Sequence, residues 1–334
     1  MKEREIRPKN LHDTILNLAK TDTENLVLPL KDKLVKVPCP ACASQKYTKK
    51  FVKTGLDYVL CDDCHTLYLS PRLPEKLMEE LYSKMESVKY WETNFYKQTA
   101  EVRREKMYAP RAKQVIDVAK KYNADKSCIM DVGCGYGVFL DEVRKKNHFD
   151  KVVGIEPVSQ LAEVSRQKDI EVIEKWITAD TVGQIDKKAS VLTCFEVLEH
   201  VYNPADFLQI FSNLLLPNGL FILSFPSTSG FDAQIMQDKS NVVYPPHHIN
   251  AMSVEGIKKL VDRVAEFELV EISTPGKLDV DIVKTALSEG KISSAGPFFD
   301  YLFWRNDQKA LNDLQTYLQK NLLSSHIFLV LKKK

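Results

Sequence analysis

The sequence predicts an α/β fold, in which a mostly parallel sheet is covered by helices and preceded by a small cysteine-bearing module. From about residue 125 onward, short apolar runs alternate with helical patterns. Strands that alternate with helices form parallel sheets, because each helix returns the chain to the same end of the sheet. Ahead of this region, four cysteines occur as two closely spaced pairs. These two observations separate a small module from a larger α/β part.

Four parts follow from this pattern. The predicted boundaries are an N-terminal segment with the cysteine module (1–70), a helical connector (71–107), a sheet domain (108–275 and 324–334) and a helical insertion before the last strand (276–323). The connector is expected to be helical because residues 74–120 are charged and helical in pattern.

The apolar runs predict the strands of the sheet domain, and cap residues predict its helices. The expected strands are 128–132, 152–156, 190–195, 220–225, 267–273 and 326–331. Asn203 can cap a helix whose first residue is Pro204 and whose apolar face includes Leu215, with an end at 216–219. Ser253 can cap a second helix, over 253–264.

Composition excludes several classes of protein. The 334 residues are 44% hydrophobic and 28% charged, as in an ordinary soluble protein, and a formal net charge of +2 gives no general basic field for nucleic acid. The locally basic run at 46–53 is expected to be a solvated face. Without an apolar run of about 18 residues or a secretory signal, we expect a cytoplasmic protein with no membrane span.

The cysteine pairs predict a structural zinc site. Cys39 and Cys42 are separated by 18 residues from Cys61 and Cys64, which suits two knuckles joined by a hairpin around one tetrahedral zinc ion. Four thiolates leave no open coordination position, so we expect the metal to stabilise the fold of the module rather than to take part in catalysis. Redox dithiols or disulfides are the alternative, which a cytoplasmic chain rarely keeps.

A glycine-rich loop at residues 131–137 follows one predicted strand and precedes a helix. Such a turn exposes backbone N–H groups and the positive end of a helix to a ligand. Val138 occupies the sixth place of a dinucleotide fingerprint, where glycine or alanine is expected, which weakens a nicotinamide-cofactor hypothesis. Glu156 ends the next strand, where an acid can bind ribose hydroxyls. An adenosine-type ligand is implied, with a solvated loop acid as the alternative for Glu156.

The chain resembles the class I S-adenosylmethionine-dependent methyltransferases. The resemblance rests on the glycine loop, on Glu156, and on FEVLEHVYNP (195–204), LLLPNGLFILSFP (214–226) and YPPHHINAMSVEGIKKL (244–260). It implies a Rossmann-like seven-stranded sheet with helices on both faces and S-adenosylmethionine as cofactor. The residues it assigns to the cofactor are Asp131, Gly133, Gly135, Gly137, Glu156, Phe195 and Glu196. Trp176 is a further, weaker candidate for the adenine, with a core position as the alternative.

The residues that serve the methyl acceptor are less determined. His247 and His248 are candidate catalytic bases on a loop at the ligand-binding edge, whereas His200 is expected to be structural. The insertion is expected to form a lid or acceptor pocket, in which Asp279, Asp281 and Arg305 bind hydroxyls or phosphates. A packed appendage or a dimer contact is the alternative for the insertion.

The cysteine module ahead of this domain resembles the start of bacterial methyltransferases that act on sugars and related small metabolites. The resemblance implies a small-molecule acceptor, with a hydroxyl of a nucleotide-linked or related sugar as the expected one. A ribosomal RNA guanine methyltransferase and a non-catalytic binding module stay open as alternatives, and so do oxygen, nitrogen or carbon as the acceptor atom and the oligomeric state.

Overall fold

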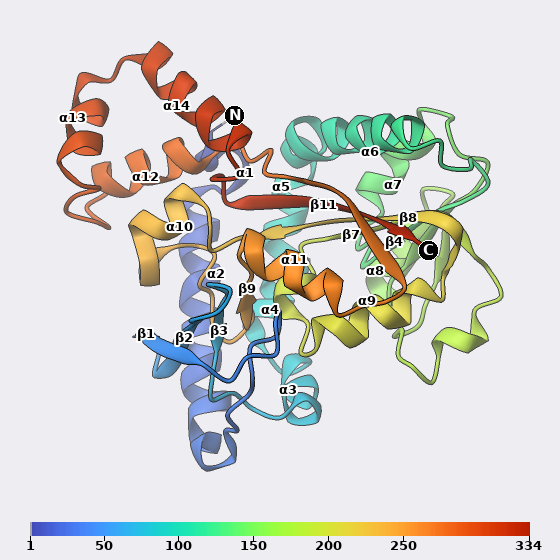
Figure 1. Ribbon diagram of the computed structural model, residues 1–334, viewed down its shortest axis with the longest axis horizontal. Helices are drawn as coiled ribbons and strands as arrows, with labels where there is room; N and C mark the ends of the chain where they lie inside the picture. Colours follow the sequence, from blue (N-terminus) through green and yellow to red (C-terminus); the bar gives the residue numbers. More distant parts are fainter. Residues whose placement is uncertain (1) are drawn as a thin grey trace.

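The computed structural model describes residues 2–334, and a seven-stranded sheet forms its centre in the order β10-β11-β8-β7-β4-β5-β6 (Figure 1). Strands β6, β5, β4, β7 and β8 run parallel, and β11 is antiparallel to β8 and to β10. The bounds are β4 Ile129–Val132, β5 Val152–Ile155, β6 Glu171–Ile173, β7 Ala189–Phe195, β8 Leu215–Pro226, β10 Phe267–Ser273 and β11 His326–Lys333. The predicted strands and the Rossmann-like seven-stranded fold are therefore confirmed.

Helices cover both faces of this sheet, because successive strand side chains point to opposite faces. On β4, Ile129 packs with α6 and α7, whereas Met130 packs with α9 and α11 on the other face. Figure 1 shows α6 above the sheet and α9 and α11 below it. The bounds are α6 Ala109–Lys121, α7 Val138–Arg144, α8 Ser159–Arg166, α9 Pro204–Ser212 and α11 Val254–Asp262, with the short turns η5 Val182–Gln184 and η6 Leu198–His200.

The two predicted helix caps are confirmed, and one predicted helix end is wrong. The side chain of Asn203 accepts hydrogen bonds from the first turn of α9, and Ser253 caps α11 through the backbone N–H of Gly256. Helix α9 ends at Ser212, and Leu215 lies in β8. The helical spacing of Leu215 misled the prediction, because a buried strand residue is equally apolar.

The cysteine module forms a second sheet, which the larger domain completes. Its strand order is β1-β2-β3-β9, and β9 comes from the loop before α11. The bounds are β1 Tyr47–Lys53, β2 Leu56–Cys61, β3 Leu67–Leu69 and β9 Asn250–Ala251. The antiparallel β1–β2 pair is the hairpin expected between the cysteine pairs. The basic run is not solvated throughout, since Lys53 donates to the Val243 carbonyl and burial lowers its pKa to about 8.

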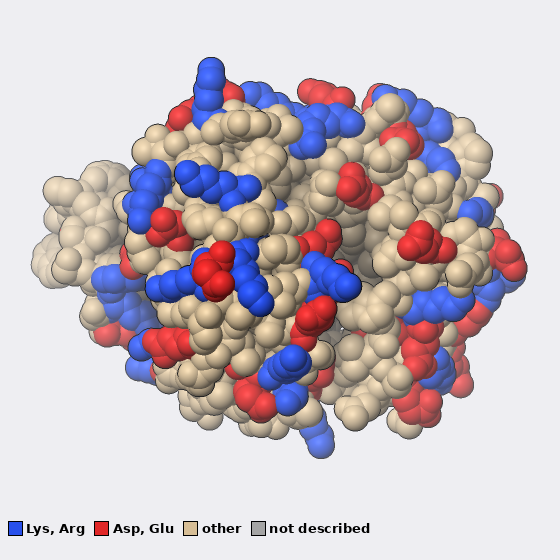
Figure 2. All heavy atoms as spheres, turned by 90° about the horizontal axis from the view of Figure 1, so that it is seen from below, with Lys and Arg blue, Asp and Glu red and all other residues tan. Residues whose placement is uncertain are grey.

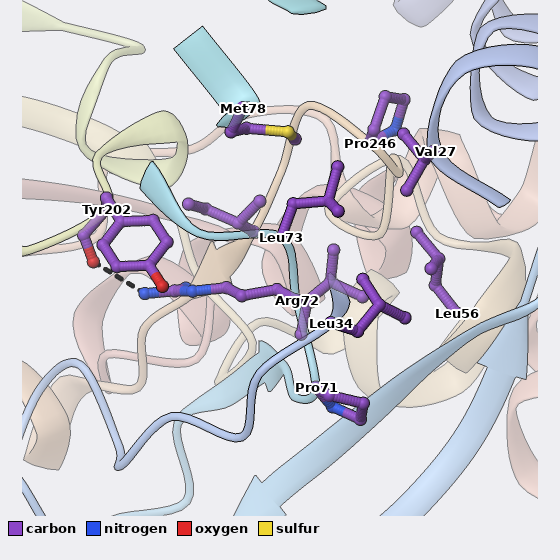
Figure 3. A pocket seen from close by; sticks show the side chains of 11 residues that line it. Val27, Leu34, Leu56, Pro71, Arg72, Leu73, Met78, Tyr202 and Pro246 are labelled. Carbon is purple, nitrogen blue, oxygen red and sulfur yellow. Dashed lines mark hydrogen bonds between the residues drawn. The ribbon is translucent and has the colours of Figure 1, made fainter. Parts of the chain in front are cut away.

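Arg72 joins the module to the sheet domain (Figure 3). Its guanidinium donates to the Tyr202 carbonyl at 2.7 Å and to Asn250 Oδ1 at 2.9 Å, and it lies over the Tyr202 ring. Beside it lies a cavity of ≈ 10 Å³, lined by apolar side chains such as Leu73 and Met78. A space of this size holds one water at most, so the cavity is a packing gap rather than a ligand site.

Further helices precede and follow the cysteine module in the chain. Among them, α2 is an amphipathic helix that buries Leu11 and Ile15. The N-terminal bounds are α1 Glu3–Ile6, α2 Lys9–Asp22, η1 Thr23–Val27 and η2 Leu28–Lys33. The bounds that follow the module are α3 Glu75–Tyr82, α4 Glu86–Tyr90, η3 Trp91–Phe95, α5 Tyr96–Arg103 and η4 Arg104–Tyr108.

The segment between β10 and β11 projects from the body as three helices (Figure 1). It forms its own apolar cluster with Phe231 of α10. Asp279 is buried and its carboxylate accepts from Ser324 and Ser325, so the expectation that it binds an acceptor is wrong. Asp281 accepts from the backbone N–H of Glu3, and its assignment to an acceptor stays a prediction, as does that of Arg305. The bounds are α10 Phe231–Met236, η7 Gln237–Lys239, α12 Asp279–Ser288, α13 Pro297–Arg305 and α14 Gln308–Lys320. Within residues 2–334, no helix has the length and apolar character to cross a membrane.

Candidate functional site

The glycine loop leaves β4 at the point where the strand order of the sheet reverses, which is where open α/β sheets bind ligands. Gly133, Gly135 and Gly137 have φ values of 70°, 53° and 67°, in the left-handed region that glycine adopts without strain. A Cβ on Gly137 would meet Ser165 Oγ at 2.8 Å, whereas a Cβ on Gly135 would have no atom within 4 Å. The loop therefore packs on α8 at Gly137 and faces open space at Gly135.

Glu156 follows β5 and faces this loop. Its Oε2 accepts from the backbone N–H of Gly135 at 2.9 Å, and its Oε1 accepts from that of Val158 at 3.0 Å. Burial raises the pKa of Glu156 above its ordinary value, while these two backbone donors oppose the shift. A carboxylate held in this way keeps further lone pairs for a ligand's hydroxyl groups.

Asp131 is buried at the carboxyl end of β4, where Thr193 Oγ1 donates to its Oδ1 at 2.6 Å. Burial raises the pKa of Asp131 to about 7, although the Thr193 hydrogen bond and the charge of Arg111 act against the shift. The negative charge of Glu156 adds to the increase. Asp131 thus ionises only near and above neutral pH in the ligand-free protein, and its charge there lowers the stability of the fold.

We expect Asp131→Asn to stabilise the ligand-free protein at pH 8, by at most about 4 kcal/mol. A carboxyl group whose folded pKa is raised lowers stability as pH rises from its unfolded pKa to its folded pKa, here from about 4 to about 7. The two proteins should therefore have similar free energies of unfolding near pH 4 and diverge above it. Urea denaturation at several pH values measures the difference, and a parallel pH dependence in both proteins would contradict it.

Phe195 and Glu196 end β7 beside the glycine loop. Arg111 lies over the Phe195 ring at 4.5 Å and 3.6 Å from Glu196 Oε1, and Glu196 also contacts His326 at 3.1 Å. Burial raises the pKa of Glu196, but His326 and Arg111 outweigh it and hold the pKa well below its ordinary value. Glu196 is therefore ionised and is held in place by its contacts with Arg111 and His326.

Trp176 follows β6 and is 68% exposed, so the core position considered for it is wrong. Its assignment to the adenine stays a prediction.

Aromatic side chains of the connector cover the glycine loop. The Tyr136 hydroxyl donates to the Glu92 carbonyl at 2.5 Å, and the Tyr96 ring stacks on the Tyr136 ring at 4.6 Å. No sequence motif connects Tyr96 to this loop, although aromatic residues recur in the otherwise charged connector.

His247 is buried and held by residues that sequence analysis did not identify. Its Nε2 lies 2.8 Å from Ser87 Oγ, and the Ser87 hydroxyl donates to Asp22 Oδ2 at 2.5 Å. Since the hydroxyl proton goes to Asp22, the imidazole N–H donates to Ser87. Burial lowers the pKa of His247 to about 3, with a smaller contribution from His200. His247 is therefore neutral at pH 7.

The adjacent His248 lies near His200 and Glu199. Their three ligand atoms, two ring nitrogens and one carboxylate oxygen, lie within 4.8 Å of one another. His200 Nδ1 is 3.0 Å from the His247 carbonyl, as expected of a structural histidine.

The four cysteines of the module lie together, with all four sulfur atoms within 4.8 Å of one another. The Cys39–Cys64 and Cys42–Cys61 sulfur pairs are each separated by 3.5 Å. Zinc–sulfur bonds of about 2.3 Å in a tetrahedron place sulfur atoms about 3.8 Å apart. The cluster therefore has the donor set and nearly the size of a four-thiolate zinc site. Cys128, Cys134 and Cys194 are buried outside this cluster.

A family profile described as "Methyltransferase domain" matches residues 103–272, half of the 334 residues. The chain belongs to the methyltransferase domain family. The match includes the glycine loop, Glu156, and the strands β4 to β8 that position them.

Curated relatives match a shorter part of this methyltransferase. A ubiquinone biosynthesis O-methyltransferase of Pasteurella multocida is 32% identical over 111 residues, 29% of this chain and 45% of the relative. A mitochondrial ubiquinone biosynthesis O-methyltransferase of Arabidopsis thaliana is 30% identical over 101 residues, 28% of this chain and 31% of the relative. The chain therefore spans less than half the length of these two relatives.

Solved methyltransferase structures are similar at lower identity. The plantazolicin methyltransferase BamL, crystallised with a triazolic desmethylPZN analog and SAH, is 13% identical with a TM-score of 0.49. The similarity covers 75% of this chain and 92% of that chain. At this TM-score and identity, the likeness carries no argument about function.

Proposed function

We propose that the protein transfers a methyl group from S-adenosylmethionine to a hydroxyl of a small acceptor, specifically a nucleotide-linked or related sugar. The observation that carries the proposal is the open space at Gly135 opposite the buried carboxylate of Glu156. Other features near the point where the strand order reverses do not require a nucleoside ligand. A glycine backbone without side chains that faces a carboxylate suits one.

The residues around this space fit the cofactor. The glycine backbone and the start of α7 suit the methionine carboxylate, because a helix N-terminus attracts negative charge. Glu156 would accept hydrogen bonds from the two ribose hydroxyls, and Trp176 would lie against the adenine. Asp131, when ionised, would attract the positively charged methionine amino group.

S-adenosylmethionine supplies a methyl group on a sulfonium, so that a carbon–oxygen bond forms as the carbon–sulfur bond breaks and S-adenosylhomocysteine leaves. The protein must align the acceptor oxygen with that methyl group and accommodate the hydroxyl proton. His247 and His248 are the proposed groups on the acceptor side, since burial leaves both neutral at pH 7. By their names, the ubiquinone-biosynthesis relatives methylate oxygen, which supports an oxygen acceptor.

We also infer that the four clustered cysteines bind a structural zinc ion. The module consists of three short strands, and small domains of this kind depend on a metal or a neighbour for stability. Four thiolates would complete the coordination of zinc and leave no position for a substrate.

A methyl-transfer screen tests the acceptor class. The protein is incubated with labelled S-adenosylmethionine and either nucleotide sugars or ribosomal RNA. We expect label in a nucleotide sugar and none in RNA, because acidic and basic side chains are interspersed on the face shown in Figure 2 without a continuous basic stripe. Label in RNA alone would overturn the sugar assignment, and no label in any acceptor despite cofactor binding would favour a binding module.

A further inference from the structure

Three side chains on the acceptor side of the site lie close together, and each presents a hydrogen-bond acceptor to the others. Glu199 and His200 belong to η6, which follows β7, and His248 lies in the loop before β9. One atom from each, two imidazole nitrogens and a carboxylate oxygen, lies within 4.8 Å of the others. Closely placed acceptors of this kind repel one another unless a cation or a proton lies between them.

The tautomers of the two histidines follow from their partners. His200 Nδ1 lies 3.0 Å from the His247 carbonyl, and His248 Nδ1 lies 3.0 Å from the Val242 carbonyl. A carbonyl oxygen only accepts, so both Nδ1 atoms carry the proton and both Nε2 atoms present a lone pair. A backbone carbonyl that holds the second ring nitrogen is the usual support of a metal-binding histidine.

Glu199 lacks the partners that a buried carboxylate needs. It is 4% exposed, its Oε2 is buried without a hydrogen-bond partner, and its Oε1 is 3.9 Å from His200 Nε2. The guanidinium of Arg111 lies 3.6 Å from Glu196 and is paired with that residue. The carboxylate therefore requires a positive charge that the neighbouring side chains do not supply.

We propose that Glu199, His200 and His248 bind a divalent metal ion. Two imidazoles and one carboxylate suit Zn²⁺, Mn²⁺, Fe²⁺ or Co²⁺. Three protein ligands, unlike the four thiolates of the cysteine module, leave coordination positions open to an oxygen of a bound molecule. The distances require a small contraction of the cluster, because metal–ligand bonds of about 2.1 Å bring ligand atoms to about 3–4 Å from one another.

The location of the proposed ion indicates a role in catalysis, and this role rests on the proposed methyl transfer. Its ligand His248 is adjacent in the chain to His247, the other candidate base, and the His248 ring packs edge-on against that of His200 at 5.0 Å. A metal-bound hydroxyl of the acceptor would lose its proton more readily and would be held in place for the methyl group, and His247, which is not a ligand, would be the histidine left to take that proton.

Titration of the full-length protein with MnCl₂, followed by the EPR signal of free Mn²⁺, tests the site without cofactor or acceptor. Mn²⁺ prefers oxygen and nitrogen ligands, so the four-cysteine cluster does not compete for it. We expect one site in the wild type. We expect Glu199→Gln and His248→Ala to weaken its affinity by about 100-fold or more. Wild-type protein that binds no Mn²⁺ at millimolar concentration, or variants that bind it as tightly as the wild type, would overturn the proposal.

Two controls keep this result interpretable. Glu199→Gln keeps the shape of the side chain and removes a buried charge, so it should fold, with a melting temperature at least equal to that of the metal-free wild type. His247→Asn changes a buried histidine next to the cluster but outside it, and should keep Mn²⁺ affinity. Equal loss of affinity in His247→Asn would contradict the assigned ligands. Since no methyl transfer is measured, the metal site and the proposed reaction can fail independently.

Discussion

Glu156→Ala should weaken binding of S-adenosylhomocysteine by about 100-fold, because hydrogen bonds to a charged acceptor contribute about 1.5 kcal/mol or more each and two are lost. The substitution also removes the acceptor of the Gly135 N–H, so the loop loses its support. The fold should persist, since burial raises the pKa of Glu156 and its charge does not stabilise the ligand-free protein. Isothermal titration calorimetry measures the affinity directly.

Glu163→Ala is the matched control for this substitution. Glu163 lies on the neighbouring helix α8, and its side chain is 60% exposed in a long ion pair with Arg166. Its replacement should leave the affinity unchanged. If Glu156→Ala bound S-adenosylhomocysteine as tightly as Glu163→Ala does, the carboxylate would not bind the ribose.

Cys39→Ser should release the metal and lower the melting temperature by about 10 °C or more, since a structural zinc ion contributes on the order of 10 kcal/mol to folding. The loss should extend beyond the module. Strand β9 completes the module's sheet, and Ser253, the cap of α11, donates to the Cys64 carbonyl. Calorimetric melting together with elemental analysis of the purified protein measures both effects.

Cys128→Ala provides the comparison for the metal. Cys128 is buried outside the cluster, so its variant should retain one zinc per chain despite some loss of stability. A wild-type protein that is free of metal and melts at the same temperature as Cys39→Ser would contradict the structural zinc ion.

Local signals in the sequence were enough for much of the fold. The caps at Asn203 and Ser253 act within one helical turn, and the glycine loop acts between one strand and the next helix. Each of these features is encoded by residues close together in the chain, so a spacing rule can predict it. Leu215 shows the limit, because an apolar residue can serve a helix or a buried strand.

Contacts between distant segments could not be predicted in this way. Ser87 reaches Asp22 across 65 positions and His247 across 160, and no periodicity connects these residues. The same holds for β9, whose two residues gave no strand signal and pair with the module through its third strand. Tertiary packing decides such pairs, so the residues that hold His247 were identified only from the structure.

The most direct test of the cofactor site is the position of S-adenosylhomocysteine in crystals of the protein grown with it. The account predicts a nucleoside whose ribose hydroxyls lie within hydrogen-bond distance of the Glu156 carboxylate and whose methionine portion lies against Gly135. A nucleoside bound elsewhere, or side chains that fill the space beside Gly135 while the nucleoside is absent, would contradict it.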